Sequence, residues 1–280
     1  MISLIRRALN FLKNKGLKLF VKQIFISLSH RLGISIKIHP LARTRGLHKA
    51  RKIFNNRKLI YIEDGYWMLE PMPTKDELNE YYSNVYWGSW LDRDYGVKLR
   101  DFFHFNLIEK YLPEFNSSPK KILNFGAGDG GISFLFHQKG HHICNVEPSS
   151  LINIFDNRWE TFNDMDSVKD YDYDLIYGRH SLEHISDLDN FLLQVQKRLS
   201  KDSYVFWEVP NADNPLNGPL ENTISVPHTY YFQKKFFEKE FKDIIFSTCY
   251  DAEQAHVSKF SDWDQFINDK GDCLMVLGKY

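Results

Sequence analysis

The 280-residue sequence predicts an α/β fold with a mostly parallel, doubly wound sheet, preceded by a basic, helix-rich amino-terminal extension. Between residues 120 and 210, strand-like apolar runs alternate with helix-like segments, as in parallel sheets covered by helices. Charge is also divided unevenly. Residues 1–62 carry 15 Lys and Arg and no Asp or Glu, although the whole chain has 36 residues of each sign.

The extension contains a candidate amphipathic helix within residues 2–28. Ile5, Leu9 and Leu12 share one helical face, and basic residues lie between them. Such a helix either packs on the main domain with its lysines in solvent, which we favour, or lies on an anionic membrane surface. No apolar run reaches the ~18 residues of a membrane span. The basic start also lacks the cleavage site of a secretory signal.

Cysteine usage indicates the compartment. Cys144, Cys249 and Cys273 show neither disulfide-framework nor zinc-site spacing, which favours a reducing cytoplasm. Peripheral attachment at the inner membrane surface through the basic extension is the alternative. The basic charge also suggests nucleic acid, but no recognised nucleic-acid motif accompanies it, so that partner is not expected.

We divide the chain at residue 98, into an extension with a helical and loop lead-in (1–98) and the α/β domain (99–280). In the lead-in, Thr74 and Glu77 have capping-box spacing, which predicts a helix beginning there. The α/β domain opens with an amphipathic helix over residues 99–112, before the first strand of the sheet.

A glycine-rich turn follows the first strand of the domain. The apolar run Ile122–Phe125 leads into Gly126, Gly128 and Gly130, and a helix-like segment follows. Glycines let a ligand approach the backbone closely, and the helix start is electropositive. Gly131 also completes the dinucleotide pattern Gly-x-Gly-x-x-Gly. The spacing alone is therefore also compatible with a loop that binds a nicotinamide cofactor, and with a tight turn that binds no ligand.

An acid ends the second predicted strand. Residues 141–146 form that strand, and Glu147 follows, 17 residues after Gly130. An acid at this position accepts hydrogen bonds from both ribose hydroxyls of a nucleotide cofactor. The alternative is an ordinary exposed acid at a strand end.

A third motif follows the strand predicted at residues 172–178. It reads Leu182-Glu183-His184 and precedes a helix, and another strand follows at 204–209. The Gly-x-Gly-x-Gly turn, the acid and this motif, in this order over residues 120–212, resemble those of class I S-adenosylmethionine-dependent methyltransferases. We expect residues 211–230 to form a loop over the sheet, closed by His228–Phe232, where the last helix begins.

The resemblance implies a Rossmann-like sheet of seven strands whose last strand, Cys273–Lys279, is antiparallel. It also implies S-adenosylmethionine as the cofactor. Asn124 stands where the family usually has an acid, and Asn163 and Asp164 are alternative acceptors for the adenine amino group. The positions that would bind the cofactor are Asn124, Gly126, Ala127, Gly128, Gly130, Glu147, Asn163, Asp164 and Arg179.

Methyl transfer to a hydroxyl or carbon acceptor benefits from a general base, for which histidine is the usual choice. His184 and His228 are the candidate catalytic residues, with His180 as a third candidate, and each has a structural role as its alternative. Glu183 is expected to support the loop. We expect no metal site, because no acids are clustered and no cysteine precedes Cys144.

The acceptor class comes from a narrower resemblance. Residues 64–86 are similar to the lead-in of bacterial methyltransferases acting on sugars. This resemblance implies a sugar or nucleotide-sugar hydroxyl in surface-polysaccharide biosynthesis as the acceptor. The alternatives are a lipid-linked acceptor, a nucleic acid, or a non-catalytic protein that keeps the fold as a scaffold.

Overall fold

The computed structural model describes residues 57–81, 97–148, 159–169, 171–214, 228–251, 267 and 269–280. The helix predicted within residues 2–28 lies outside the described residues, and the domain boundary at residue 98 stays a prediction. The described elements all belong to one unit, Leu47–Tyr280.

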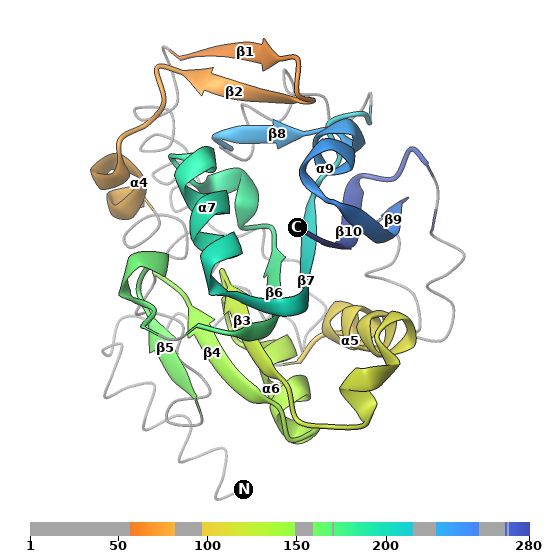
Figure 1. The fold of residues 1–280 in the computed structure, drawn as a ribbon. Helices are drawn as coiled ribbons and strands as arrows, with labels where there is room; N and C mark the ends of the chain where they lie inside the picture. The colour runs from red at the N-terminus through yellow and green to blue at the C-terminus, as the bar shows by residue number, and fades with distance from the viewer. Residues whose placement is uncertain are drawn as a thin grey trace, which may run out of the picture. The chain divides into compact units, whose positions relative to one another are not determined.

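A seven-stranded sheet forms the centre of this unit (Figure 1), in the order β5-β4-β3-β6-β7-β10-β9. The strands are β3 Lys121–Phe125, β4 His142–Val146, β5 Glu160–Phe162, β6 Tyr173–Arg179, β7 Leu199–Pro210, β9 Asp243–Tyr250 and β10 Cys273–Lys279. Strands β3 to β7 pair in parallel, whereas β10 is antiparallel to both β7 and β9. This arrangement confirms the predicted doubly wound sheet with an antiparallel last strand.

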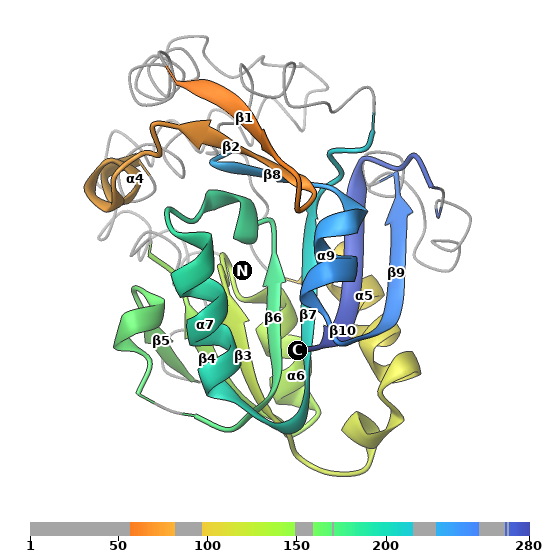
Figure 2. The same ribbon diagram turned by 45° about the horizontal axis from the view of Figure 1, so that its top comes forward.

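Helices cover both faces of the sheet (Figure 2). The side chains of α7 (Leu188–Arg198) and α9 (Lys234–Glu240) pack on one face, and those of α5 (Leu99–Tyr111) and α6 (Gly131–Gln138) on the other. Neighbouring residues of one strand therefore enter different cores: Ile122 of β3 joins the α5–α6 cluster, and Leu123 joins the α7–α9 cluster. Burial on both faces explains why the central strands are continuous apolar runs.

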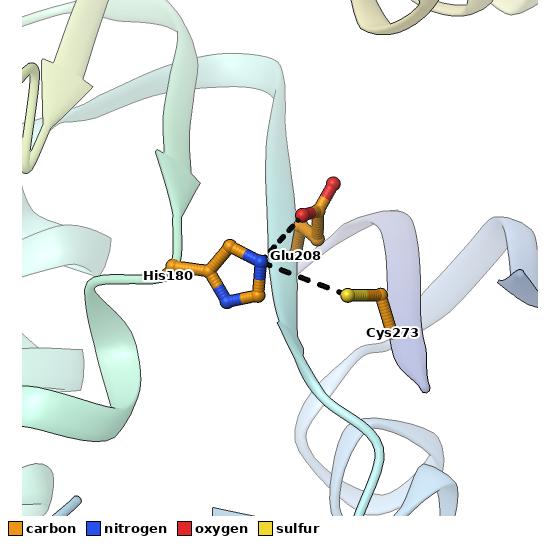
Figure 3. A group of neighbouring side chains, drawn as sticks. All are labelled: His180, Glu208 and Cys273. Carbon is orange, nitrogen blue, oxygen red and sulfur yellow. Dashed lines mark hydrogen bonds and ion pairs between the residues drawn. The ribbon is translucent and has the colours of Figure 1, made fainter. Parts of the chain in front are cut away.

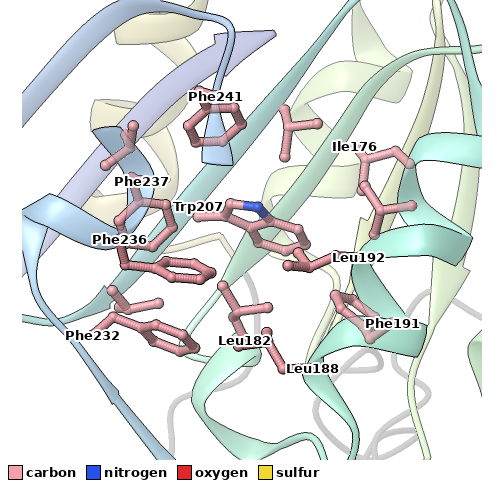
Figure 4. Packing of buried hydrophobic residues seen from close by; sticks show 14 of the residues in the cluster. Ile176, Leu182, Leu188, Phe191, Leu192, Trp207, Phe232, Phe236, Phe237 and Phe241 are labelled. Atoms are coloured by element: carbon pink, nitrogen blue, oxygen red, sulfur yellow. The ribbon is translucent and has the colours of Figure 1, made fainter. Parts of the chain in front are cut away.

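Trp207 of β7 lies in the middle of the α7–α9 core (Figure 4) and is fully buried. Its ring packs against Phe191 of α7, with ring centroids 5.9 Å apart. On the neighbouring strand, a Cβ at Gly178 would lie 2.1 Å from Cζ3 of Trp207. The glycine is therefore what allows a tryptophan at this position. Truncating Trp207 to alanine is expected to cost about 3–5 kcal/mol.

A second, smaller sheet contains β1 (Lys58–Ile62), β2 (Tyr66–Glu70) and β8 (Tyr230–Phe232). The prediction that a helix begins within residues 228–232 was wrong. Three consecutive aromatic residues, which favour strands, pair instead with Tyr66–Met68 of β2, and α9 begins only at Lys234. The partner strand lies more than 150 positions away in the sequence, so no local pattern indicates the pairing.

The predicted capping box at the start of α4 (Lys75–Tyr81) is confirmed. The Glu77 amide donates to Thr74 Oγ1 at 3.2 Å, and the Thr74 amide donates to Glu77 Oε2 at 2.8 Å. Two free donors at the helix start are thereby satisfied. Within the described residues, no helix is long and apolar enough to cross a membrane.

Candidate functional site

The predicted site residues follow strands that are neighbours in the sheet. Strands β4, β3, β6 and β7 are adjacent and parallel, so their carboxyl ends lie along one edge. The glycine turn follows β3, Glu147 follows β4, and Arg179 ends β6. In open α/β sheets, ligands bind in the crevice at this edge.

The glycine turn needs its glycines for its backbone shape. Gly126, Gly128 and Gly130 have φ values of 70°, 56° and 72°, in the left-handed region that glycine enters without steric cost. A Cβ at Gly126 would also lie 2.5 Å from Cβ of Ser181. The carbonyl of Val146 anchors the turn by accepting from the amides of Gly126 (2.8 Å) and Ala127 (3.0 Å).

Glu147 lies against the glycine turn. Its side chain is buried, and Oε2 accepts a hydrogen bond from the Gly128 amide at 2.7 Å. Its own amide donates to the Phe162 carbonyl at the end of β5. Glu147 therefore joins three strand ends, and its predicted contact with a ribose stays a prediction.

Asn124 belongs to a buried polar chain beneath the turn. Its Nδ2 donates to Ser133 Oγ of α6 at 2.8 Å, and Ser133 Oγ donates to Asn145 Oδ1 of β4 at 2.7 Å. This chain links two strands to the helix, a structural role that the sequence did not indicate. Its predicted contact with the cofactor stays a prediction.

Asn163 and Asp164 directly follow β5, where they were expected. Asn163 is exposed. Asp164 Oδ1 accepts from both the amide and the hydroxyl of Ser167, at 2.8 and 2.7 Å, and so caps a short 3-10 helix. The adenine contact proposed for this pair stays a prediction.

Arg179 ends β6 and, although partly exposed, forms an ion pair with a buried acid. Its Nη1 lies 2.6 Å from Oδ1 of Asp101, near the start of α5. The other oxygen of Asp101 accepts from the Lys98 amide at 2.8 Å, and the Lys98 ammonium pairs with Asp129 of the glycine turn. Burial alone would lower the pKa of Arg179, but Asp101 holds it well above the ordinary value. The sequence did not reveal these partners, because no motif spacing relates them.

Glu208 of β7 is a fully buried acid that the sequence did not single out. Its Oε2 accepts from Tyr250 Oη at 2.9 Å and lies 2.5 Å from His104 Nε2. Its Oε1 lies 2.9 Å from His180 Nε2 and 3.4 Å from Arg100 Nη1. Burial would raise the pKa of Glu208, but the neighbouring His104 and Arg100 hold it well below the ordinary value. We call these five residues the Glu208 network.

His180 also contacts Cys273 of β10, which lies outside the Glu208 network (Figure 3). Its Nε2 also lies 3.6 Å from Cys273 Sγ, and its Nδ1 lies 3.2 Å from Glu183 Oε1. Burial opposes its charge, but Cys273 and the two carboxylates raise its pKa well above the ordinary value. Its φ of 47° is uncommon for a residue with a Cβ. Contacts at both ring nitrogens hold it in this conformation.

The two candidate catalytic histidines lie side by side, although they are 44 positions apart in the sequence. The ring centroids of His184 and His228 are 4.9 Å apart, and His184 Nε2 lies 3.8 Å from Glu183 Oε1. Thr229 holds the two segments together, because its amide and hydroxyl both donate to the Glu183 carbonyl at 2.8 Å. We call Glu183, His184 and His228 the His–Glu cluster.

This cluster contains two buried polar atoms without partners. Within the described residues, neither Glu183 Oε2 nor His228 Nδ1 has a hydrogen-bond partner, and both side chains are at least nine-tenths buried. Burial, reinforced by the charge of His184, lowers the pKa of His228 to about 3. His228 is therefore a neutral imidazole at neutral pH.

Residues 91–248 match a family model described as a methyltransferase domain, which is more than half of the chain. The chain belongs to the methyltransferase-domain family. This membership confirms the enzyme class that the three motifs predicted. The glycine turn, Glu147 and the His–Glu cluster of this methyltransferase all lie within the matched residues.

Solved structures similar to this methyltransferase include two described as S-adenosylmethionine-dependent methyltransferases. The Archaeoglobus fulgidus protein is 14% identical, with a TM-score of 0.47, over 64% of this chain and 94% of the other. The Mesorhizobium loti protein is also 14% identical, with a TM-score of 0.47, over 65% and 100%. A Haemonchus contortus phosphoethanolamine N-methyltransferase is 16% identical, with a TM-score of 0.46, over 62% and 52%. None of the curated proteins matches the chain.

Proposed function

We propose that this methyltransferase transfers the methyl group of S-adenosylmethionine to a hydroxyl of a sugar or nucleotide sugar. One observation carries the proposal. The glycine turn, Glu147 and the segment of His184 all follow parallel strands at one edge of the sheet, and His228 lies beside His184. The turn and Glu147 suit the nucleoside and amino-acid parts of the cofactor. The sugar class is supported by the resemblance of residues 64–86 to the lead-in of sugar methyltransferases.

The reaction is an in-line displacement. The acceptor oxygen forms a bond to the methyl carbon while the carbon–sulfur bond breaks, and both electrons of that bond remain on sulfur. The acceptor proton passes to a base. His184 is the candidate for that base, because the depressed pKa of His228 makes it a poor base at neutral pH. His228 is suited to accepting a hydrogen bond that orients the hydroxyl.

The first test is calorimetric binding of S-adenosylmethionine and S-adenosylhomocysteine. We expect Gly128→Arg and Glu147→Ala to weaken binding at least tenfold, because the first fills the turn and the second removes the acid that holds it. Gly140→Ala is the matched control, since Gly140 also has a positive φ of 88° but has no atom within 4 Å of the added Cβ. Folded wild-type protein that binds neither compound at millimolar concentration would contradict the proposal.

Turnover then separates the acceptor classes. A screen with nucleotide sugars, measured as S-adenosylhomocysteine release, is expected to yield a substrate. Turnover only on lipid-linked or nucleic-acid acceptors would replace the sugar class. Cofactor binding without turnover on any acceptor would favour a scaffold that keeps the fold.

We also propose a cytoplasmic location. For peripheral attachment to the inner membrane surface, the basic amino-terminal extension is the proposed contact. The three cysteines are buried and form no disulfide, which supports a reducing compartment. Co-sedimentation with anionic vesicles, compared between the full chain and a chain lacking residues 1–46, tests the membrane contact. Equal sedimentation of the two chains would contradict it.

A further inference from the structure

We propose that Glu183, His184 and His228 bind one divalent transition-metal ion of the Zn²⁺ class. Each residue offers one ligand atom, and these three atoms all lie within 4.8 Å of one another. Two of the ligands come from the 3-10 turn Leu182–His184 after β6, and the third directly precedes β8. The hydrogen bonds of Thr229 to Glu183 and Ile185 hold the two segments together without using any of the three side chains.

The two unpartnered atoms of this cluster are available to a ligand that lies between its side chains. Glu183 Oε2 and His228 Nδ1 are buried and have no hydrogen-bond partner within the described residues. Buried polar atoms are nearly always satisfied, and an exception calls for a specific explanation such as an ion. A lone pair on a carboxylate oxygen and one on a neutral imidazole nitrogen are both metal-ligating groups. A single ion between them would satisfy both atoms.

The neighbouring group His180, Glu208 and Cys273 has similar residue types but does not need an ion (Figure 3). Both oxygens of Glu208 already have partners, and the Arg100 guanidinium lies 3.4 Å from one of them. A positive group at that distance repels a metal cation. Of the two groups, the His–Glu cluster is the one with buried ligand atoms that have no hydrogen-bond partner within the described residues.

The ligand set selects the kind of ion. Two imidazoles and one carboxylate suit Zn²⁺ and its first-row neighbours, whereas Mg²⁺ and Ca²⁺ prefer ligands that are all oxygen. Two ligands bonded to one ion at about 2.1 Å are roughly 3.0–4.2 Å apart. The Glu183 carboxylate reaches this range, because its Oε1, the oxygen that also contacts His180, lies 3.8 Å from His184 Nε2.

Three protein ligands leave a coordination position open, as in catalytic rather than structural zinc sites. Resting on the proposed function, we assign this position to the acceptor hydroxyl. The ion would lower the pKa of the coordinated hydroxyl. Its proton then leaves to solvent, and the oxygen attacks the methyl carbon as the carbon–sulfur bond breaks. In this arrangement the two histidines act through the ion and not as direct bases. The proposal departs from the expectation of no metal site.

Metal binding can be tested without cofactor or acceptor, so its failure is distinguishable from failure of the proposed function. The untagged full chain is stripped with a chelator and titrated with Zn²⁺ by calorimetry. We expect one ion per chain. Glu183→Gln and His228→Asn are expected to weaken binding at least tenfold, while the exposed-histidine control His142→Asn and the neighbouring-group control Cys273→Ser leave it unchanged.

Co²⁺ absorption of the wild type provides a second readout, which does not depend on whether the Glu183 and His228 variants fold. Visible d–d bands without a thiolate charge-transfer band are expected for nitrogen and oxygen ligands. A thiolate band that disappears in Cys273→Ser would move the site to the neighbouring group and overturn the proposal. Less than one ion per wild-type chain, or wild-type affinity in folded Glu183→Gln and His228→Asn, would also overturn it.

Discussion

The Glu208 network and the His–Glu cluster lie next to each other in this methyltransferase. They differ in whether the carboxylate oxygens of their buried acids have hydrogen-bond or ion-pair partners. In the Glu208 network, both carboxylate oxygens have donors or cations around them. In the His–Glu cluster, one carboxylate oxygen and one imidazole nitrogen have no hydrogen-bond partner in the part of the chain that the structure describes. His180 contacts an acid of each group. The comparison teaches that similar residue types serve different ends: the satisfied group, whose carboxylate is paired at both oxygens, stabilises the fold, and the unsatisfied group, with a carboxylate oxygen unpaired among the described residues, is available to a ligand.

The largest effect that we expect is a loss of stability on substituting Glu208, the acid of the satisfied group. Glu208→Gln removes the buried charge that compensates His180 and Arg100, and should lower the free energy of unfolding by about 3–5 kcal/mol. Urea denaturation at pH 7 measures this loss. A loss below about 1 kcal/mol would remove the distinction between the two groups.

The same variant has a defined pH dependence. The folded-state pKa of Glu208 lies well below the ordinary value of 4.5, so its contribution to stability is fully present above pH 4.5 and is lost as the pH falls through the folded-state pKa. The difference in unfolding free energy between wild type and Glu208→Gln should therefore be constant from pH 7 to about 4.5 and narrow below that. If the difference in unfolding free energy already decreases between pH 7 and pH 6, another titrating group dominates the pH dependence.

The next effect is a gain of stability from the unsatisfied group. An ion that binds only the folded protein stabilises it by about 2.7 kcal/mol at a free concentration 100 times its dissociation constant. Wild type should show this gain with Zn²⁺ in urea denaturation, and His228→Asn should not. An equal gain in both proteins would mean that the ion binds elsewhere.

Removing one donor from the satisfied group should have an intermediate effect. Tyr250→Phe deletes the hydroxyl that donates to Glu208 Oε2 at 2.9 Å, and hydrogen bonds to charged groups contribute about 1.5–3 kcal/mol. Unfolding free energy should fall by about this amount, while Zn²⁺ affinity stays that of the wild type. A parallel loss of Zn²⁺ affinity would show that the two groups are not independent.

The smallest effect on stability is expected at Glu183. Its Oε2 has no hydrogen-bond partner among the described residues, and His180, which contacts its Oε1, keeps Glu208 as a partner. Glu183→Gln should therefore change the unfolding free energy of the metal-free protein by no more than about 1 kcal/mol. Denaturation in the presence of chelator tests this value, and a loss as large as that of Glu208→Gln would contradict the comparison.

The sequence by itself determined the features that depend on near neighbours. The strand at residues 122–125, the glycine turn, the acid at 147, the capping box at Thr74 and the order of the motifs were all predicted, and the fold was confirmed. The physical reason is that strand and helix periodicity, left-handed turns and caps are decided within a few residues of each other. Because these strands are parallel, the motifs that follow their carboxyl ends lie along the same edge of the sheet.

Only the tertiary structure decided which distant side chains meet. Asp101 with Arg179, His104 with Glu208, and His184 with His228 come from segments 44 to 104 positions apart, and β8 pairs with a strand still more distant. None of these contacts has a spacing pattern, because each depends on sheet order and on the helix or strand that covers each face. Once buried together, these groups must satisfy one another in a medium where an unpaired charge is costly. Burial thus produced one network whose carboxylate is paired at both oxygens and one cluster in which a carboxylate oxygen and an imidazole nitrogen have no hydrogen-bond partner within the described residues.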